Sequence, residues 1–245
     1  MSKLPENAVD NDARIRHLTG PLARACSDEH VFLVDGDRTL SPDDTSRIFL
    51  RRAGGDPRVI KQRFERDGYC FAAFRFHAEH HINLGQEIFA RLVPEIAAEV
   101  QVHDGAVEFL TAAKARARVF VVSAGIPAIW RAILDIHGLD DVGVIGGIDP
   151  VDPFVFGRSE KGTVTRLFLD ARCTVIGVGD SDVDAELLGL AHHAVVVVNH
   201  RQNVDLIPHL VAHPSLWQVA PHGQSHANIP VLAFPDVANL ARNSH

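Results

Sequence analysis

The 245-residue sequence lacks any uninterrupted apolar run near the roughly twenty residues that span a membrane. Its first thirty residues mix acidic and basic side chains, so they do not form the continuous apolar stretch of a targeting segment. Internal repeats and low-complexity tracts are also missing. We therefore expect a globular protein of the cytoplasm that has no membrane partner.

Cysteine is scarce, since Cys26, Cys70 and Cys173 are the three in the chain and lie far apart. Their number is odd, and they form neither a CxxC pair nor a Cys/His spacing that binds zinc. The sequence therefore has no disulfide framework and no zinc-ligand set. It predicts thiols in a reducing compartment.

An excess of basic charge is missing as well. The formal net charge is -7, and basic clusters such as Arg51-Arg52 are short. Proteins that bind nucleic acid through its phosphates usually carry a basic face, so we expect no nucleic-acid partner. What the chain does have is an ordinary globular composition, with 46% hydrophobic and 22% charged residues. We expect a monomer or a homodimer with one full core and a smaller additional domain.

The order of the apolar segments predicts the fold. Val31 to Val34 form an apolar run that is typical of a strand buried on both faces of a parallel sheet. From His103 onward such strands alternate with amphipathic helices, which indicates right-handed βαβ units. We predict an α/β protein with a doubly wound parallel sheet and an inserted helical cap. The Rossmann-like core comprises residues 1–42 and 101–245, and the cap comprises residues 43–100.

The two ends of the chain give weaker signals. Residues 1 to 27 are polar and predict a short helix or two. The tail over residues 221–245 is rich in Pro, His and Asn, and we expect it to wrap the edge of the core.

Polar side chains follow the predicted strands, and parallel strands bring their carboxyl ends to one edge of a sheet. The set consists of one hydroxyl, one lysine and four carboxylates: Ser123, Lys161, Asp35, Asp37, Asp180 and Asp184. So many carboxylates cannot all ionise at close range without a cation, because like charges raise one another's pKa. Oxygen ligands suit magnesium, which keeps coordination positions for a substrate phosphate. The residue types thus point to magnesium and phosphate.

Four ordered motifs, DGDRT, VVSAG, SEKG and GDSDVD, carry a resemblance over roughly residues 30 to 200. The chain resembles phosphatases of the haloacid dehalogenase superfamily, most of all their phosphoserine phosphatase branch. The resemblance implies a magnesium-dependent phosphomonoester hydrolase that forms an aspartyl-phosphate on a small phosphorylated metabolite. In these terms Asp35 attacks phosphorus and Asp37 acts as general acid and base.

The resemblance also assigns the remaining motif residues. Thr39 and Ser123, with Ala124 beside it, would hold the phosphate group, and Lys161 would neutralise its charge. Magnesium would be held by Asp35, Asp180 and the backbone carbonyl of Asp37. Asp184 would orient Lys161 or a metal-bound water.

In this family a helical cap closes over the site, which favours small substrates. Cap residues that are candidates for reading the leaving group are Asp44, Arg63, Arg66 and Arg75. The motifs depart from the phosphoserine branch at two positions: Val183 stands where that branch usually has Asn, and Ala124 where it prefers Gly. A sugar phosphate or another small phosphomonoester is therefore as good a candidate as phosphoserine.

Other interpretations of the same residues need weighing. The segment DGDRTLSPDDTS resembles a calcium loop, but Leu40 and Ser46 stand where that loop needs Gly and Glu. Asp182 is best explained as an acid in a first helical turn. The histidines of FHAEHH, namely His77, His80 and His81, fit a solvated cap helix better than a metal site, because a zinc helix has the pattern H-E-x-x-H.

Rival functions remain open at this point. A non-catalytic phosphoacceptor signalling domain also uses an acidic cluster, a hydroxyl and a lysine, but it needs no second acid such as Asp37. A dehalogenase needs neither this second acid nor magnesium. A phosphomutase or phosphotransferase of the same fold differs only in what accepts the phosphoryl group.

Overall fold

The computed structural model describes residues 3–198 and 203–242. Its centre is a seven-stranded sheet in the order β3-β2-β1-β4-β5-β6-β7, in which all neighbouring strands are parallel. The strands are β1 (His30–Val34), β2 (Arg118–Val122), β3 (Gly143–Ile145), β4 (Thr174–Gly179), β5 (His193–Val197), β6 (Leu216–Val219) and β7 (Val231–Leu232). The predicted doubly wound α/β sheet is confirmed.

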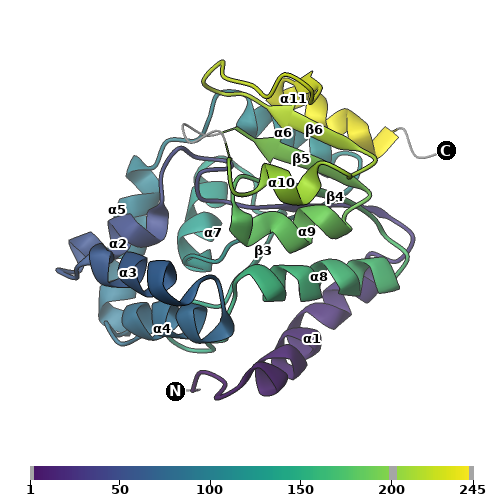
Figure 1. The fold of residues 1–245 in the computed structure, drawn as a ribbon. Helices are drawn as coiled ribbons and strands as arrows, with labels where there is room; N and C mark the ends of the chain where they lie inside the picture. Colours follow the sequence, from purple (N-terminus) through teal and green to yellow (C-terminus); the bar gives the residue numbers. More distant parts are fainter. Residues whose placement is uncertain (1–2, 199–202, 243–245) are drawn as a thin grey trace.

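Helices cover both faces of the sheet, which explains why the strands are apolar without alternation. Phe32 and Val34 of β1 pack into one hydrophobic cluster, whereas Val31 and Leu33 pack into the other. The first cluster lies under α6 (Ala106–Lys114), α7 (Pro127–Ile136) and α11 (Phe234–Val237). The second lies under α1 (Ala8–Ala25), α8 (Arg158–Asp170), α9 (Ala185–Leu190) and α10 (Ile207–Leu210) (Figure 1).

The predicted cap segment is helical, and it forms the left end of the molecule in Figure 1. Its helices are α2 (Thr45–Arg52), α3 (Pro57–Asp67), α4 (Phe71–Ile82) and α5 (Gln86–Glu99). Carboxylates begin the first two, because Asp44 accepts a hydrogen bond from the Arg47 main-chain N–H, and Asp56 accepts one from that of Arg58. The exact division of the chain into two domains stays a prediction.

The cap is joined to the core by apolar contacts. Phe89 of α5 and Phe49 of α2 lie with their ring centroids 4.6 Å apart, within the same cluster as Phe32 and Val34. At the other end of the cap, Phe74 of α4 packs on Val155 and Val183 of the core.

Both ends of the chain differ from the sequence-based expectation. The first segment is one 18-residue helix, α1, instead of a short helix or two. Asn7 caps it by accepting from the N–H groups of Val9 and Asp10, and Ile15 and Ala23 are buried along its face. Figure 1 shows this helix lying alongside α8.

The C-terminal tail does more than wrap the edge, because β7 within it adds a strand to the sheet beyond β6. β6 and β7 are both too short for their apolar residues to show the periodicity of a strand in the sequence. The buried Gln218 fixes this edge by donating side-chain hydrogen bonds to the main-chain oxygens of His226 and Ile229. The last three residues of the tail, 243–245, lie outside the described residues.

The structure also bears on membrane spans and on the cysteines. Across residues 3–198 and 203–242, no helix combines the length and the apolarity of a membrane span. All three cysteines are free thiols, of which Cys26 and Cys173 are buried and Cys70 is exposed.

Candidate active site

The loop after β1 carries the first two carboxylates. Asp35 continues the strand pairing, since its main-chain N–H donates to the Val178 oxygen at 2.8 Å. The next residue must be glycine, because a Cβ atom on Gly36 would lie 2.3 Å from the Trp130 indole. The same indole then donates to the Asp37 carboxylate at 2.9 Å. The close approach of Gly36 to Trp130 therefore places Asp37.

The loop after β4 holds two more carboxylates, Asp180 and Asp184. The Asp184 carboxylate accepts hydrogen bonds from the main-chain N–H groups of Asp180 and Ser181, both at 3.1 Å. Gly179 makes room for this turn, because a Cβ atom there would lie 2.6 Å from the Asp184 carboxyl carbon. Asp180 and Asp184 of GDSDVD are thus held together through the main chain.

Asn203 supports the loop after β4, although the sequence did not single it out. Its side-chain amide donates to the main-chain oxygens of Asp180 and Val197, and it is buried. Asn203 therefore ties the β4 loop to the end of β5. It has a left-handed φ of 50°, which asparagine tolerates better than most residues, but no local pattern connects it to Asp180.

The third and fourth motifs bring Ser123 and Lys161. Ser123 follows β2, and its hydroxyl oxygen accepts a hydrogen bond from the Gly125 N–H at 3.1 Å. Lys161 lies in the first turn of α8, and its ammonium group is 2.5 Å from Asp35 and 2.6 Å from Asp184. The structure therefore brings all four motifs to the carboxyl edge of the sheet.

Asp35, Asp180 and Asp184 offer carboxylate oxygens that all lie within 4.8 Å of one another. They are 6%, 1% and 0% exposed, so water screens their repulsion poorly. Burial and the charge of Asp184 raise the pKa of Asp35 to about 6, although Lys161 opposes this. Burial alone would lower the pKa of Lys161, but Asp184 and Asp35 outweigh it and raise that pKa.

Among the residues that the structure describes, the buried ammonium group of Lys161 contacts Asp35 and Asp184, two of the three buried carboxylates. Arg38 adds partial compensation at 3.9 Å from Asp180, yet its side chain is 45% exposed. A buried cluster of carboxylate oxygens fits a hard divalent cation. The donor set of this site therefore fits a metal ion.

Asp37 has a different environment from that of Asp35. Its carboxylate accepts from the Thr45 N–H at 3.1 Å and from the Thr45 hydroxyl at 2.8 Å, besides Trp130. Burial, followed by the charges of Asp44 and Asp35, raises the pKa of Asp37 to about 7. Near neutral pH this carboxyl group therefore exists in both protonation states, as a proton-transfer group requires.

A cavity of about 670 Å³ lies between this edge of the sheet and the cap helices. Asp35, Asp37, Ser123, Ala124 and Lys161 line its core side. Thr39 is buried below them, where its hydroxyl donates to Asp35 at 3.0 Å. Its expected contact with phosphate stays a prediction.

The cap candidates fall into two groups. Asp44 lines the cavity, but Arg63, Arg66 and Arg75 are not among the described residues that do so. Arg63 and Arg66 both pair with Asp67, and Arg75 pairs with Glu79. Their role in substrate choice stays a prediction, and their positions indicate ion pairing along the cap helices.

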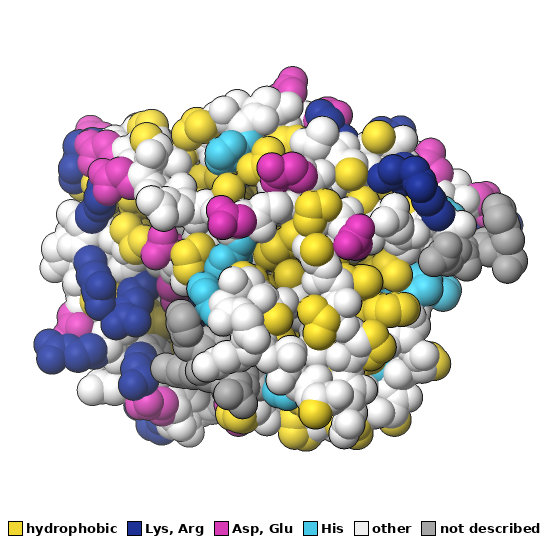
Figure 2. Space-filling view, turned by 90° about the horizontal axis from the view of Figure 1, so that it is seen from above, with side chains coloured by type: hydrophobic (Ala, Val, Ile, Leu, Met, Phe, Trp, Pro, Cys, Tyr) yellow, Lys and Arg dark blue, Asp and Glu magenta, His cyan; other side chains and the backbone are white. Residues whose placement is uncertain are grey.

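Other basic side chains take the cavity positions. These are Arg38, Arg47, Arg51, Arg58 and Lys61. Most of them come from α2 and α3, and Figure 2 shows Lys and Arg side chains gathered at the end of the molecule that the cap forms.

The histidines of α4 are less solvated than expected, since His77 is 7% and His81 0% exposed. Both ring nitrogens of His81 face main-chain oxygens, those of His77 and Ser46, so His81 links α4 to α2. His80 lies against the Phe76 ring. Outside the carboxylate cluster, Asp182 pairs with Arg158 at 2.9 Å, which agrees with a structural role.

The chain belongs to the haloacid dehalogenase-like hydrolases, because the model of that family matches residues 32–189. The expected superfamily is confirmed, and the protein is a hydrolase of that family. No curated protein matches the sequence closely enough to add to this.

Solved structures agree on the fold. A substrate-bound phosphoserine phosphatase complex has 18% identity and a TM-score of 0.55, over 74% of this chain and 90% of that chain. A phosphoserine phosphatase with a phospho-aspartyl intermediate analogue has 18% identity and a TM-score of 0.53, over the same shares. A protein with unknown function from Bordetella pertussis Tohama I has 17% identity and a TM-score of 0.61, over 79% and 99%.

We predict that Lys161→Met destabilises the protein by about 3–5 kcal/mol near pH 8, a loss typical of removing one partner from a buried ion pair. Without the ammonium group, the pKa of Asp35 moves further above its unfolded value, because Asp184 remains an anion beside it. Protonation relieves that repulsion, so the loss shrinks as the pH falls from about 8 to about 6, where Asp35 of the unaltered protein also takes up a proton. Urea unfolding in metal-free buffer, near pH 8 and near pH 6, measures this loss in the free energy of unfolding.

The matched control is Lys114→Met, which removes a surface lysine paired with Asp141 at 2.7 Å. Surface ion pairs contribute little, so its loss should be small and nearly independent of pH. Equal losses for the two variants at both pH values would contradict the buried pairing.

Proposed function

We propose that this hydrolase is a magnesium-dependent phosphomonoesterase that forms an aspartyl-phosphate on Asp35. The observation that carries the proposal is the contrast between two carboxylates of one loop that line one cavity. Asp35 is paired with an ammonium group and stands in a carboxylate cluster, whereas Asp37 is held by neutral donors and has a pKa of about 7. A nucleophile and a proton donor need these two different environments.

In the first step, a carboxylate oxygen of Asp35 attacks phosphorus while the bond to the leaving oxygen breaks. Lys161 favours the anionic form of Asp35, which burial disfavours. Asp37 donates its proton to the leaving alcohol and then accepts one from the water that attacks the acyl phosphate. Ser123 and Ala124 line the same cavity as Asp35, and we assign them the phosphoryl oxygens.

We infer that magnesium is held by Asp35, Asp180 and the main-chain carbonyl of Asp37, with Asp184 beside it. When bound, the metal supplies positive charge that lets an anionic phosphate approach an anionic nucleophile. Asp184 also accepts from Lys161 at 2.6 Å, so we assign it the orientation of that lysine.

The substrate we propose is a small phosphorylated metabolite, either phosphoserine-like or a sugar phosphate, used by a cytoplasmic monomer or homodimer. The two similar phosphoserine phosphatase structures, one named for a bound substrate and one for a phospho-aspartyl analogue, support this chemistry. A phosphomutase or phosphotransferase would share every step up to the acyl phosphate. A signalling acceptor domain is disfavoured, because it has no use for the proton-transfer group Asp37.

The metal assignment predicts that chelation abolishes phosphatase activity and that magnesium stabilises the fold. A ligand at 100 times its Kd adds about 2.7 kcal/mol to the free energy of unfolding. Asp180→Asn should lose most of this gain, because it removes one of the clustered carboxylates. Thermal melts with and without magnesium measure the effect independently of turnover.

Asp182→Asn is the matched control, since this acid is two residues away and pairs with Arg158. It should keep the stabilisation by magnesium. Full activity after exhaustive chelation, or equal loss in both variants, would refute the site.

The nucleophile assignment predicts opposite behaviour for two amide variants. Asp35→Asn should form no phosphoenzyme, because an amide is a poor nucleophile. Asp37→Asn should slow turnover of alkyl phosphates by about a hundred- to ten-thousand-fold, the usual range for general acid–base catalysis. With an activated aryl phosphate, whose leaving group needs no proton, Asp37→Asn should accumulate phosphoenzyme.

Rapid quench followed by intact-mass measurement and peptide mapping detects the adduct. Phosphate on a residue other than Asp35, or undiminished steady turnover by Asp37→Asn, would overturn the assignment.

The raised pKa of Asp37 predicts a shift in pH dependence. Asp44 is one of the charges that raise it, so Asp44→Asn should lower the pKa of Asp37. The acid then loses its proton at lower pH, and the alkaline limb of kcat/KM for an alkyl phosphate moves to lower pH. Asparagine still caps α2, which protects the local fold.

Trp130→Phe should shift the limb the other way, because it removes a donor that favours the anion. Asp43→Asn removes the same charge next to Asp44 but outside the described cavity lining, and it should leave the limb in place. Shifts of the same sign in all three variants would show that Asp37 does not set this limb.

A further inference from the structure

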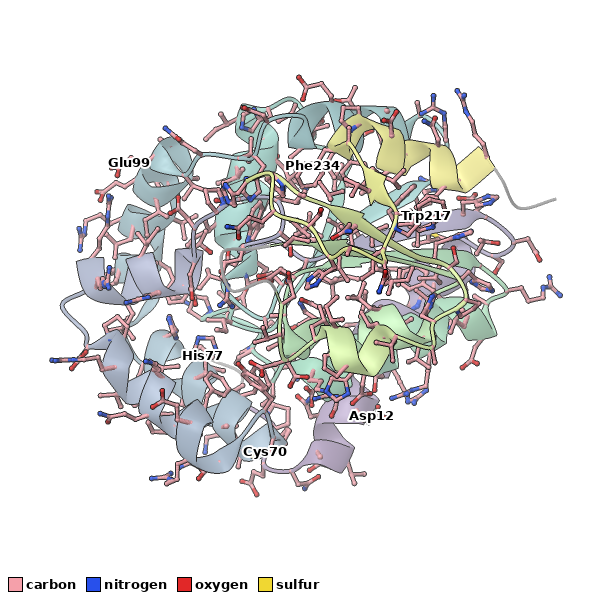
Figure 3. The ribbon with its side chains drawn as sticks, turned by 45° about the horizontal axis from the view of Figure 1, so that its top comes forward. Asp12, Cys70, His77, Glu99, Trp217 and Phe234 are labelled. Atoms are coloured by element: carbon pink, nitrogen blue, oxygen red, sulfur yellow. The ribbon has the colours of Figure 1, made fainter. Side chains whose placement is uncertain are left out.

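The cap side of the cavity is lined by aromatic rings. Phe64 of α3, Tyr69 between α3 and α4, and Phe74 and His77 of α4 all border the cavity. Phe64 lies at the centre of the group, with ring centroids 5.3 Å from Tyr69, 4.9 Å from Phe74 and 5.8 Å from His77. Figure 3 shows His77 among the cap helices and Cys70, the residue after Tyr69, at the start of α4.

The rings of Phe64, Tyr69, Phe74 and His77 form an aromatic wall, which extends to the residues beside the proposed phosphate site. Phe64 and Phe74 belong to a small apolar cluster that also contains Ala124 and Val183. Ala124 follows Ser123 directly, and Val183 precedes Asp184. Apolar surface therefore begins next to the proposed phosphate site and continues into the cap.

The rings differ in how firmly they are fixed. Phe74 is 4% exposed and packs so closely on the core that a Cβ atom on Gly157 would lie 2.2 Å from its ring. Tyr69 is 44% exposed, and Phe64 is half-buried. Phe64 and Tyr69 therefore still have apolar surface that a ligand can cover.

Tyr69 also approaches the core side of the cavity. Tyr69 lines the same cavity as Arg38, Asp35 and Ser181, and Ser181 directly follows Asp180 of the carboxylate cluster. A ligand that contacts Tyr69 therefore lies within reach of the carboxylate cluster.

The size of the cavity exceeds what a three-carbon alcohol needs. Its volume of about 670 Å³ falls in the range of pockets that take drug-sized ligands, about 300–1,000 Å³. Aromatic side chains bind flat rings by offset or edge-to-face contact, and base stacking of this kind tolerates different bases.

We propose that the leaving group of the natural substrate carries a flat aromatic ring, which binds against Phe64 and Tyr69 while the phosphate group lies against Asp35 and Lys161. A nucleoside monophosphate has this chemistry. The assignment rests on the proposed phosphatase activity and narrows its substrate, from a phosphoserine-like compound or a sugar phosphate, to a sugar phosphate that carries a base.

The test compares adenosine 5′-monophosphate with ribose 5-phosphate, which has a hydroxyl group in place of the base. With magnesium, kcat/KM should be about ten- to a hundred-fold higher for the nucleotide, the usual worth of one stacked base. Tyr69→Leu and Phe64→Leu should remove most of this preference, chiefly through KM, and leave ribose 5-phosphate nearly unchanged. Phe76→Leu is the control, because Phe76 lies on α4 outside the described lining of the cavity.

Equal rates on both compounds would overturn the ring assignment while leaving the phosphatase intact. Cap variants that scale both substrates equally would overturn it as well. If neither compound is hydrolysed, a binding measurement still decides, because the unaltered protein with magnesium should bind the nucleotide at least about ten-fold more tightly than the sugar phosphate.

Tyr69 is the only tyrosine in the sequence, so ring-labelled tyrosine gives an NMR signal from one site. This signal should shift on addition of adenosine 5′-monophosphate but not of ribose 5-phosphate. An unchanged signal at saturating nucleotide would exclude Tyr69 from the binding surface.

Discussion

The rest of the site depends on the ion pairs that Lys161 makes with Asp35 and Asp184. A buried charge is costly unless it is paired, so the ends of β1 and β4 and the first turn of α8 must meet at one point. Such pairs add little net stability, because desolvation offsets their attraction. What they provide is position, since the three segments come from distant parts of the chain and a shift of any one of them leaves a charge unpaired.

The DGD loop illustrates how environment separates two identical side chains. Asp35 faces an ammonium group and other carboxylates, whereas Asp37 faces an indole, a hydroxyl and a main-chain N–H. Gly36 makes this possible, because only a residue without Cβ lets the chain pass so close to Trp130. The two carboxyl groups of one short loop therefore acquire distinct partners, and chemical roles follow from the partners.

Much of the site could be predicted from the sequence, because parallel strands gather their carboxyl ends. Asp35, Ser123 and Asp180 meet for this reason, and Lys161 joins them from the first turn of α8. Asn203 could not be found in this way, since only the folded chain brings it to the Asp180 oxygen. The sequence also did not show which cap arginines face the cavity, because packing sets how each helix is rotated about its own axis. Burial of Phe49 and Leu50 turns Arg47 and Arg51 of α2 toward the cavity, while Arg63, Arg66 and Arg75 pair with nearby acids. Ala124 and Val183, at which the motifs differ from the phosphoserine branch, both pack with Phe64 and Phe74 of the aromatic wall. Only the folded chain shows this contact.

The way the cap is attached limits how this chain can be rebuilt. Phe49, Phe89 and Leu92 share one continuous hydrophobic cluster with Phe32 of β1. Deletion of residues 43–100 would therefore expose part of the hydrophobic core and would also remove the cap side of the cavity. A cap transplanted from a relative would have to reproduce the packing of α5 on α7, besides carrying new contacts for a leaving group. Substitutions should therefore be tolerated best in α3, which contacts α2 and α4 and borders the cavity. They should be tolerated least in α5, which packs on α7 of the core.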